Sequence, residues 1–434
     1  MPAPMRSGMF LSLLALGFSP IYGEQATPAR GPESAGEPVV QVDELVQEML
    51  KNSPVIRAAR YRVDAAMKRP SQISTLPEPK ISVSNFGVGH PLSRLRDSDF
   101  AYVGVGVSQE IPYPGKLALA AEEARREAEA DRQAYRTIVL GATADLKAAY
   151  YDWFGTTKAI EITRKNRDLL QRFEQIARAR YSVGKGLQQD VLKAQVDEST
   201  LAQQLELLEQ RRATTEARIR SLINSERPLG RPAEIALSPF ATGLEEILAA
   251  LDAQSPRLKT KQATIDGRAV AIERSKKEYK PDLGVSAQWQ KNGAPFRDYY
   301  MLTAEVKVPL YFWRKQRFAV EESVARFREA REEYLSDRQE LIFQAKDLYL
   351  AAKTSERLLA LHRQGIIPQS ALSLESALAA YEVGNADFLT LMNSFSTVLS
   401  YELQYYRELA NHAQAVARLE ALIAMPLTER DGVK

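Results

Sequence analysis

Apolar residues recur at helical spacing through most of this chain. Residues 115–181 contain no proline. Small or apolar side chains return there in steps of four and three, as in a heptad seam, at Leu117, Ala121, Ala124, Ala128, Tyr135, Ile138 and Ala142. A second run shows the same spacing over residues 320–352. At ~1.5 Å per residue, helices of this length are longer than a globular domain needs. The pattern therefore predicts long coiled-coil arms.

Each long run ends at a short Tyr-x-Val-Gly sequence. The two copies occupy residues 181–184 and 381–384, and helix-patterned residues resume soon after each glycine. A glycine at the end of a helix commonly takes the left-handed conformation and caps that helix. The sequence therefore predicts two helical hairpins. Their tips are expected at Val183, Gly184 and Lys185 and at Val383, Gly384 and Asn385.

Two short stretches in each half alternate apolar and polar residues with a period of two. That alternation is typical of a strand with one apolar and one wet face. It is clear in residues 283–290 and 300–308, and weaker in residues 81–87 and 102–108. We expect strands at about 80–88, 99–109, 282–290 and 299–308. Each has the ~9–11 residues that cross an outer membrane at a tilt.

Four strands cannot close a barrel, and open strand edges are not tolerated in lipid, so copies of the chain must assemble. Three copies would supply twelve strands, enough for a closed barrel with an open lumen in contact with outer-membrane lipid. The wet faces would line the lumen, with Thr303, Glu305 and Lys307 as candidates. Aromatic residues near the strand ends fit an interfacial girdle. A soluble β-sandwich has little support, because the four strands are widely separated by helices.

The same order of elements occurs twice, about 200 residues apart. Ser53-Pro54 and Ser255-Pro256 each precede a helical run, and the two tips follow at a matching interval. Both halves read helix, strand, loop, strand, long helix, tip, long helix, which predicts an internal duplication. We place repeat 1 at 42–240, repeat 2 at 241–427 and a tail at 428–434. The expected fold class is mainly α with a small β part.

The start of the chain has the features of an export signal. Arg6 precedes an apolar run over residues 9–18, and polar Glu24 and Gln25 follow. We interpret residues 1–23 as a signal peptide and residues 24–41 as a flexible lead-in. No other stretch approaches the ~20 apolar residues of a transmembrane helix. The sequence has no cysteine, which excludes disulfides and a lipidated N-terminal cysteine.

Charge and motif content argue against several classes of function. The 58 basic and 55 acidic side chains nearly cancel, so no nucleic-acid partner is expected. No Gly-x-Ser-x-Gly, phosphate loop or His-Glu-x-x-His sequence occurs, and we expect no enzyme, catalytic residue or cofactor. The three histidines, His90, His362 and His412, are far apart in the sequence, so no metal site is expected.

The signal peptide, the duplicated plan, the prolines at the strand-to-helix junctions (Pro112, Pro114 and Pro309) and the two tips together resemble the TolC-type outer-membrane efflux factors. The resemblance covers residues 42–427. It implies a homotrimer with a twelve-stranded outer-membrane barrel and a helical tunnel, so that most of the chain lies in the periplasm. The implied function is a passive exit duct of a tripartite efflux or secretion system. A periplasmic adaptor and an inner-membrane pump of the RND type would be its partners.

The tips also bear on the resting state of the tunnel entrance. Asp190, six residues after Gly184, matches an acidic position that ties the closed entrance together in members of the family. The second tip departs from the pattern, because Thr390 and Asn393 stand at the corresponding candidate positions and Ala386 replaces an arginine of some members. A carboxylate favoured at the start of a helix is the alternative explanation of Asp190.

The segment Leu76-Pro77-Glu78-Pro79 and the missing cysteine are similar to the branch of this family that serves heavy-metal (cobalt, zinc and cadmium) efflux pumps. A soluble periplasmic coiled-coil adaptor or structural protein is the main alternative function, because it would also use long hairpins. It would not need strands with a lipid-type face. Dependence on detergent would separate the two.

Overall fold

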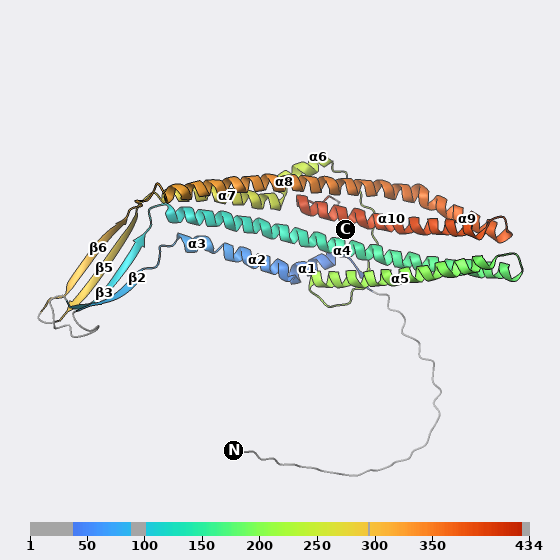
Figure 1. The fold of residues 1–434 in the computed structure, drawn as a ribbon, viewed down its shortest axis with the longest axis horizontal. Coiled ribbons are helices and arrows are strands. Elements are labelled where there is room, and N and C mark those ends of the chain that lie inside the picture. Colours follow the sequence, from blue (N-terminus) through green and yellow to red (C-terminus); the bar gives the residue numbers. More distant parts are fainter. Residues whose placement is uncertain (1–37, 88–100, 294–295, 428–434) are drawn as a thin grey trace, which may run out of the picture. The chain divides into compact units, whose positions relative to one another are not determined.

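The computed structural model describes residues 38–87, 101–293 and 296–427. From Val39 onward these residues belong to one compact unit. Helices make up most of that unit and strands a small part, which confirms the expected fold class. The sheet lies at one end of the long helices and the two hairpin tips lie at the other (Figure 1). The predicted signal peptide and tail lie outside the described residues.

The elements of repeat 1 are α1 (Val42–Asn52), α2 (Pro54–Ala66), α3 (Arg69–Ser74), β2 (Lys80–Phe86), β3 (Tyr102–Ile111), α4 (Lys116–Ser182) and α5 (Gln188–Ile223). Those of repeat 2 are α6 (Leu244–Gln254), α7 (Pro256–Lys277), β5 (Asp282–Asn292), β6 (Tyr299–Lys307), α8 (Gln316–Leu361), η1 (His362–Ile366), α9 (Ile367–Val383) and α10 (Phe388–Ile423). The order of the main elements is the same in both halves, as the internal duplication requires. Only the second outgoing arm is broken, by the π-helical turn η1.

Local sequence explains several of these boundaries. Pro54 and Pro256 occupy the first turn of α2 and α7, where a missing N–H costs nothing. Gly115 has φ 93° immediately before α4, a left-handed conformation that glycine adopts without strain. These prolines therefore mark the corners between consecutive helices, and Gly115 marks the corner between β3 and α4.

The four long strands form one antiparallel sheet in the order β2-β3-β5-β6. Strands β3 and β5 join the two repeats, and their register runs from Tyr102 opposite Asn292 to Ile111 opposite Leu283. A separate short parallel pair, β1 (Val39–Val40) with β4 (Arg231–Pro232), ties the start of repeat 1 to the segment after α5. The main sheet is thus continuous across the repeat boundary.

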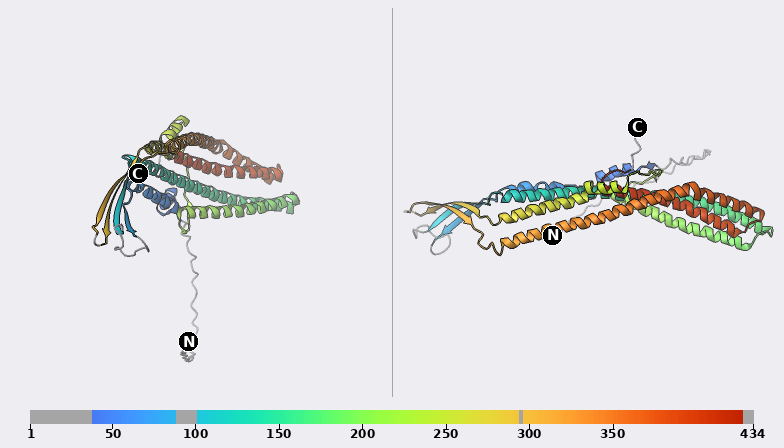
Figure 2. Two further views of the ribbon diagram at one scale, coloured as in Figure 1. Left: turned by 60° about the vertical axis from the view of Figure 1, so that its left-hand side comes forward. Right: turned by 90° about the horizontal axis from the view of Figure 1, so that it is seen from above.

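The buried core is divided into clusters along the helices. One cluster packs α1, α4 and α5 around Trp153 and Leu45. There the hydroxyl of Tyr150 donates to the carbonyl of Val40 at 2.9 Å and accepts from the N–H of Ala233 at 2.9 Å, which fixes the short β1–β4 pair. Another cluster joins the two hairpins side by side (Figure 2), where the rings of Phe173 and Phe395 lie 5.7 Å apart.

None of the helices in the described ranges combines the length and the apolar composition needed to cross a membrane.

Candidate functional site

The register of the sheet divides its side chains into two faces. One face is apolar and consists mainly of Ile81, Val83, Val103, Val105, Val107, Ile111, Leu283, Val285, Ala287, Trp289, Tyr300, Leu302, Ala304 and Val306. These residues are not a core, because Val83 is 76% exposed and Leu302 is 75% exposed in the single chain. A contiguous apolar surface of this kind is unfavourable in water and suits lipid.

The opposite face is mainly polar. It carries Lys80, Ser82, Ser84, Gly104, Gly106, Ser108, Glu110, Asp282, Ser286, Gln288, Gln290, Thr303, Glu305 and Lys307. The three residues that the sequence proposed for a lumen, Thr303, Glu305 and Lys307, all lie here. The ammonium of Lys307 is 3.7 Å from the carboxylate of Glu110. This face can therefore border a water-filled space.

Glycine on the polar face permits a close cross-strand contact. Gln288 Nε2 donates a hydrogen bond of 2.7 Å to Ser84 Oγ beside Gly104. A Cβ atom at Gly104 would stand 2.8 Å from Ser84 Oγ and 2.9 Å from Gln288 Nε2, so a larger residue would displace that bond. The glycines that weaken the sequence pattern of β3 therefore have a packing role.

The sheet has two open edges. Strands β2 and β6 are its outer members, and no further strand in the described part of the chain pairs with them. Backbone N–H and C=O groups along these edges require water or another strand as partners. Each edge is therefore a surface on which a further strand can add.

Both hairpins turn with the same backbone arrangement. Gly184 and Gly384 have φ 72° and φ 86°, the left-handed conformation of a helix C-cap. The next N–H groups, of Lys185 and Asn385, bond back to the carbonyls of Arg180 at 2.9 Å and Ala380 at 2.8 Å. The valines before the glycines stay outside: Val183 is 67% exposed and Val383 is 72% exposed. The tips thus present two exposed apolar side chains.

The structure brings only one of the sequence-proposed entrance residues toward the other hairpin. Asp190 lies in the first turn of α5, and its negative charge acts on Tyr381 of α9. Burial first, and then this charge, raises the pKa of the Tyr381 hydroxyl. In contrast, the N–H of Thr390 donates to the side chain of Asp387 at 2.8 Å, and the carbonyl of Asn393 accepts from Thr397 at 2.7 Å. Both hydrogen bonds join residues of α10 or its N-cap, so neither reaches the first hairpin.

Sequence reasoning missed the residue that connects the two tips. The guanidinium of Arg180, at the end of α4, lies 4.5 Å from the ring centroid of Tyr381. Arg180 also donates to the carbonyl of Lys185 at 3.2 Å, and its Nη2 would stand 3.4 Å from a Cβ at Gly384. The sequence held a signal, since Ala380 takes the equivalent place before the second tip. This cation–π contact links one hairpin to the other.

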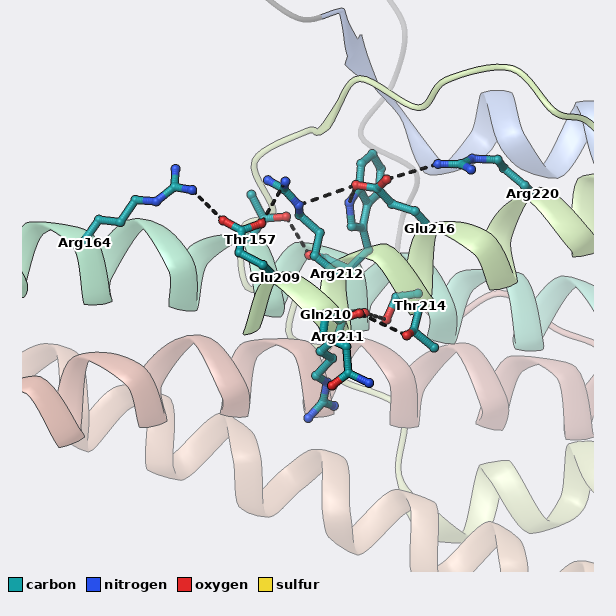
Figure 3. Close-up of polar contacts among 11 residues, drawn as sticks. Thr157, Arg164, Glu209, Gln210, Arg211, Arg212, Thr214, Glu216 and Arg220 are labelled. Carbon is teal, nitrogen blue, oxygen red and sulfur yellow. Dashed lines mark hydrogen bonds and ion pairs between the residues drawn. The ribbon is translucent and has the colours of Figure 1, made fainter. Parts of the chain in front are cut away.

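A ladder of alternating charges runs along α5 and reaches α4 at Arg164 (Figure 3). Its members are Arg164 on α4 and Glu209, Arg212, Glu216 and Arg220 on α5. Arg212 lies 2.8 Å from Glu209, and Arg220 lies 3.2 Å from Glu216. Trp153 Nε1 adds a hydrogen bond of 3.2 Å to Glu216. The pairs within α5 hold Glu209 and Glu216 in place, and the two contacts to α4, from Arg164 and Trp153, link the two helices.

The second hairpin is held together differently. Across residues 362–400, all of which the structure describes, no side-chain hydrogen bond or ion pair joins the outgoing helix to α10. Apolar contacts take their place, with Ala377 and Tyr381 packed against Phe388, Leu391 and Phe395. The ring of buried His362, in η1, lies 5.8 Å from that of Tyr401. The first hairpin has a similar apolar seam but adds polar links near its tip, whereas in the second hairpin such links, as between Ser355 and Glu408 at 2.9 Å, occur farther from the tip.

The described histidines occupy structural positions. His412 is 3% exposed, and its Nε2 lies 3.3 Å from the carboxylate of Glu356. Burial lowers the pKa of His412, against the opposing effect of Glu356. Among the described residues, no group of three histidine or carboxylate side chains is arranged to hold a metal ion. His90 lies outside those residues.

Comparison with known proteins adds to this geometry. The family model described as outer membrane efflux protein matches residues 45–225 and 249–424, one segment in each repeat. No curated protein sequence matches the chain.

Several solved structures share the fold. The outer-membrane channel OprN is 16% identical, with a TM-score of 0.76 over 88% of this chain and 89% of that one. The outer membrane protein VceC of Vibrio cholerae is 14% identical, with a TM-score of 0.75 over 89% of this chain and 96% of its own. The MtrE outer membrane channel of Neisseria gonorrhoeae, solved in its open state, is 14% identical, with a TM-score of 0.75 over 90% and 91% of the two chains.

Proposed function

Because this chain belongs to the outer membrane efflux protein family, we propose that it is an outer-membrane exit duct, a passive channel of a tripartite efflux or secretion system. The observation that carries the proposal is the two-faced sheet with open edges, joined directly to two long hairpins. A lipid-type face beside a polar face is the pattern of a membrane barrel wall. The family is one of channels, and no enzymatic activity is proposed.

The open edges favour a closed ring of three chains. In lipid, the backbone groups along β2 and β6 must find partners, because no water reaches them. Pairing of β6 in one copy with β2 in the next would satisfy both edges. Three copies of the four-stranded sheet would form twelve strands, a number that leaves an open lumen. Thr303, Glu305 and Lys307 would then line that lumen, and the apolar face would contact outer-membrane lipid.

The hairpins would form the periplasmic part of the duct. Their exposed tips, at Val183, Gly184 and Lys185 and at Val383, Gly384 and Asn385, are the proposed docking points for a periplasmic adaptor. The adaptor would connect them to an inner-membrane pump of the RND type. Asp190 and Arg180, which both act on Tyr381, would help to hold the entrance in its resting state. Thr390 and Asn393 remain candidates for contacts between copies at that entrance.

Two measurements test this function. Membrane fractionation with heat-modifiable gel mobility should recover the protein in the outer membrane as an SDS-resistant trimer. In planar bilayers the purified protein should conduct ions, and its adaptor should raise the conductance. A protein that fractionates as a soluble monomer would favour the soluble adaptor or structural alternative. A trimer that stays sealed even with its adaptor would contradict passive conduction.

The cargo is a separate proposal. The similarity of residues 76–79 to the heavy-metal branch suggests cobalt, zinc or cadmium ions as substrates. A duct need not bind its cargo, so the proposal depends on its partners. Deleting the gene from its own host should sensitise cells to these metals and leave drug sensitivity unchanged. The opposite pattern, drug sensitivity without metal sensitivity, would contradict the metal assignment.

A further inference from the structure

An aromatic hollow opens where the sheet meets the helices of repeat 2. Its volume is about 780 Å³, and its lining includes Tyr279 and Pro281 before β5 and Val308, Tyr311, Phe312 and Trp313 after β6. The rings of Phe312 and Trp313 meet edge to face at 5.2 Å, and Tyr279 lies 6.4 Å from Phe312. Tyr311 is nevertheless 69% exposed and Trp313 is 53% exposed. In a single chain the rings of the hollow are therefore exposed to solvent.

The hollow continues the lipid-type face of the sheet. Pro281 lies just before β5, two residues from Leu283, and Val308 lies just after β6, two residues from Val306. Both therefore continue the apolar alternation of the strands. Leu283 and Val306 face each other on the apolar side. If that side contacts hydrocarbon, the hollow lies one step toward the helices, at the depth of lipid headgroups. Tryptophan and tyrosine are enriched at this depth in membrane proteins.

Three exposed cations neighbour the lining residues of the hollow along the chain. Lys280 stands between two of its lining residues, and Arg314 and Lys315 directly follow Trp313. All three are exposed, and no carboxylate in the described part of the chain lies within ion-pair distance of them. A little further along α8, Arg317 already has a partner, Glu321, at 2.9 Å.

The equivalent junction of repeat 1 is built differently. There Lys116 is buried and neutralised by Glu278 at 3.2 Å and Asp282 at 2.9 Å. The position 200 residues later is the neutral Gln316. Glu278 and Asp282 belong to repeat 2 and lie two residues before and after Lys280, but Lys116 engages both carboxylates, so Lys280, Arg314 and Lys315 are left as exposed cations that an external anion can pair with.

We propose that this junction binds an anionic phospholipid, with its phosphate held by Lys280, Arg314 and Lys315 and its glycerol and upper acyl chains in the aromatic hollow. The inference rests on the proposed outer-membrane barrel. Basic residues beside aromatic rings at the membrane surface are the pattern of headgroup sites. A second copy of the chain is a poorer occupant. Its β2 would approach through residues 75–80, which offer Glu78 as their only carboxylate and add Lys80.

Native mass spectrometry of the full-length protein in detergent tests the proposal. Phosphatidylglycerol and phosphatidylcholine with identical acyl chains are added in equal amounts, and the adducts of each are counted. The wild type should retain more phosphatidylglycerol. The variant K280Q/R314Q/K315Q should lose about a hundredfold in apparent affinity for it, since each of the three cations near an anionic lipid contributes about a factor of five. The matched control R326Q/R328Q/R331Q removes three exposed positive charges farther along α8 and should keep the preference.

A second variant separates the hollow from the charges. Trp313→Ala should weaken retention of both lipids alike, because it removes apolar contact and no charge. Equal retention of the two lipids by the wild type would overturn the proposal, as would an unchanged preference in the triple variant. Loss of the SDS-resistant oligomer in the triple variant, without a change in lipid preference, would assign the hollow to a neighbouring copy. A channel that conducts but shows no preference fails only this inference, whereas a soluble monomer fails the proposed function itself.

Discussion

The two helical hairpins follow one plan but are built differently. Their return helices, α5 and α10, have 36 residues each. The outgoing helix α4 runs for 67 residues without a break, whereas the outgoing helix of the second hairpin is interrupted by η1 and carries Pro368 in the first turn of α9. In Figure 1 the second arm changes direction where α8 passes into α9. A π-turn and a proline both disturb the helical hydrogen-bond ladder.

The contacts between helices differ in the same sense. Arg164 and Glu209, and Gln171 and Glu198, bind α4 to α5 through polar side chains. Both hairpins have apolar seams, but within residues 362–400, all of them described, the second hairpin has no such polar link between its two helices. Polar cross-links fix one register, while an apolar seam allows small shifts at lower cost. We hypothesise that the first hairpin is a fixed wall of the entrance and that the second hairpin moves when the entrance opens. The following predictions test that division, from the largest expected effect to the smallest.

A proline in α4 should destabilise the first hairpin, because it would interrupt an unbroken helix. Asp168 is exposed on α4 and lies 200 positions before Pro368. Because α4 has no π-turn there, Asp168→Pro should cost about 3 kcal/mol through a lost hydrogen bond and a clash with the preceding turn. The apparent melting temperature of the purified protein should fall well below that of the control Asp168→Ala. Equal melting of the two variants would show that α4 tolerates a break as α9 does.

Loss of the charge ladder should have a smaller effect. Glu216 accepts from Trp153 and pairs with Arg220 and Arg212. Glu216→Gln should lower the stability of the first hairpin by about 1–2 kcal/mol, since hydrogen bonds to a charged group are weakened. Chemical denaturation followed by tryptophan fluorescence measures this loss. Glu206→Gln, an exposed position on the same helix, is the control, and an equal effect there would deny the ladder any special role.

Hydrogen exchange compares the two arms without mutation. The amides of α9 should exchange faster than those of residues 167–182 in α4, because the second arm opens more readily. A difference of about 1 kcal/mol in opening free energy corresponds to about a fivefold difference in rate. Mass spectrometry of peptides from both arms provides the measurement. Equal protection in both arms would remove the basis for assigning the motion to the second hairpin.

Removing the bridge between the tips should shift the resting state. Arg180→Ala abolishes the contact with Tyr381, which contributes about 0.5–1 kcal/mol at a partly exposed site. The ratio of open to closed channels should therefore rise about twofold to fivefold, as measured in planar bilayers. Arg178→Ala, which removes a cation paired with Glu174 on the same helix, should leave the ratio unchanged. A fall in the ratio would mean that Arg180 supports the open state.

Acidification should lower the stability of the protein through His412, which lies on α10 of the second hairpin. His412 faces Glu356 and Lys353 of α8, and burial lowers its pKa below the ordinary 6.5. The unfolded chain then takes up a proton at a higher pH than the folded chain does. The stability that neutral His412 provides is present above about pH 6.5 and is lost as the pH falls below it. His412→Gln should flatten the decline of melting temperature between pH 7.5 and 5.5. An unchanged slope would contradict a role for this histidine.

The sequence by itself determined the repeating elements of this protein. Heptad spacing predicted the long helices, and alternation in residues such as Leu283 and Val285 predicted the strands, because both signals depend only on neighbours along the chain. Glycine at 184 and 384 marked the tips for the same reason. The strand at Tyr102–Ile111 overlaps the one expected at about 99–109, of which residues 99 and 100 lie outside the described part of the chain.

Only the tertiary structure decided how distant segments meet. The pairing of β3 with β5 makes one two-faced sheet from two repeats, and it requires contacts across about 200 residues of sequence. The same holds for Arg180 on Tyr381 and for the aromatic hollow near Trp313. The break at η1 was not predicted either, although Gly365 and Pro368 lie at it, because a glycine or proline alone does not show whether a long helix bends or ends. Local periodicity fixes which face of an element is apolar, whereas packing decides what that face contacts and where a long helix is interrupted.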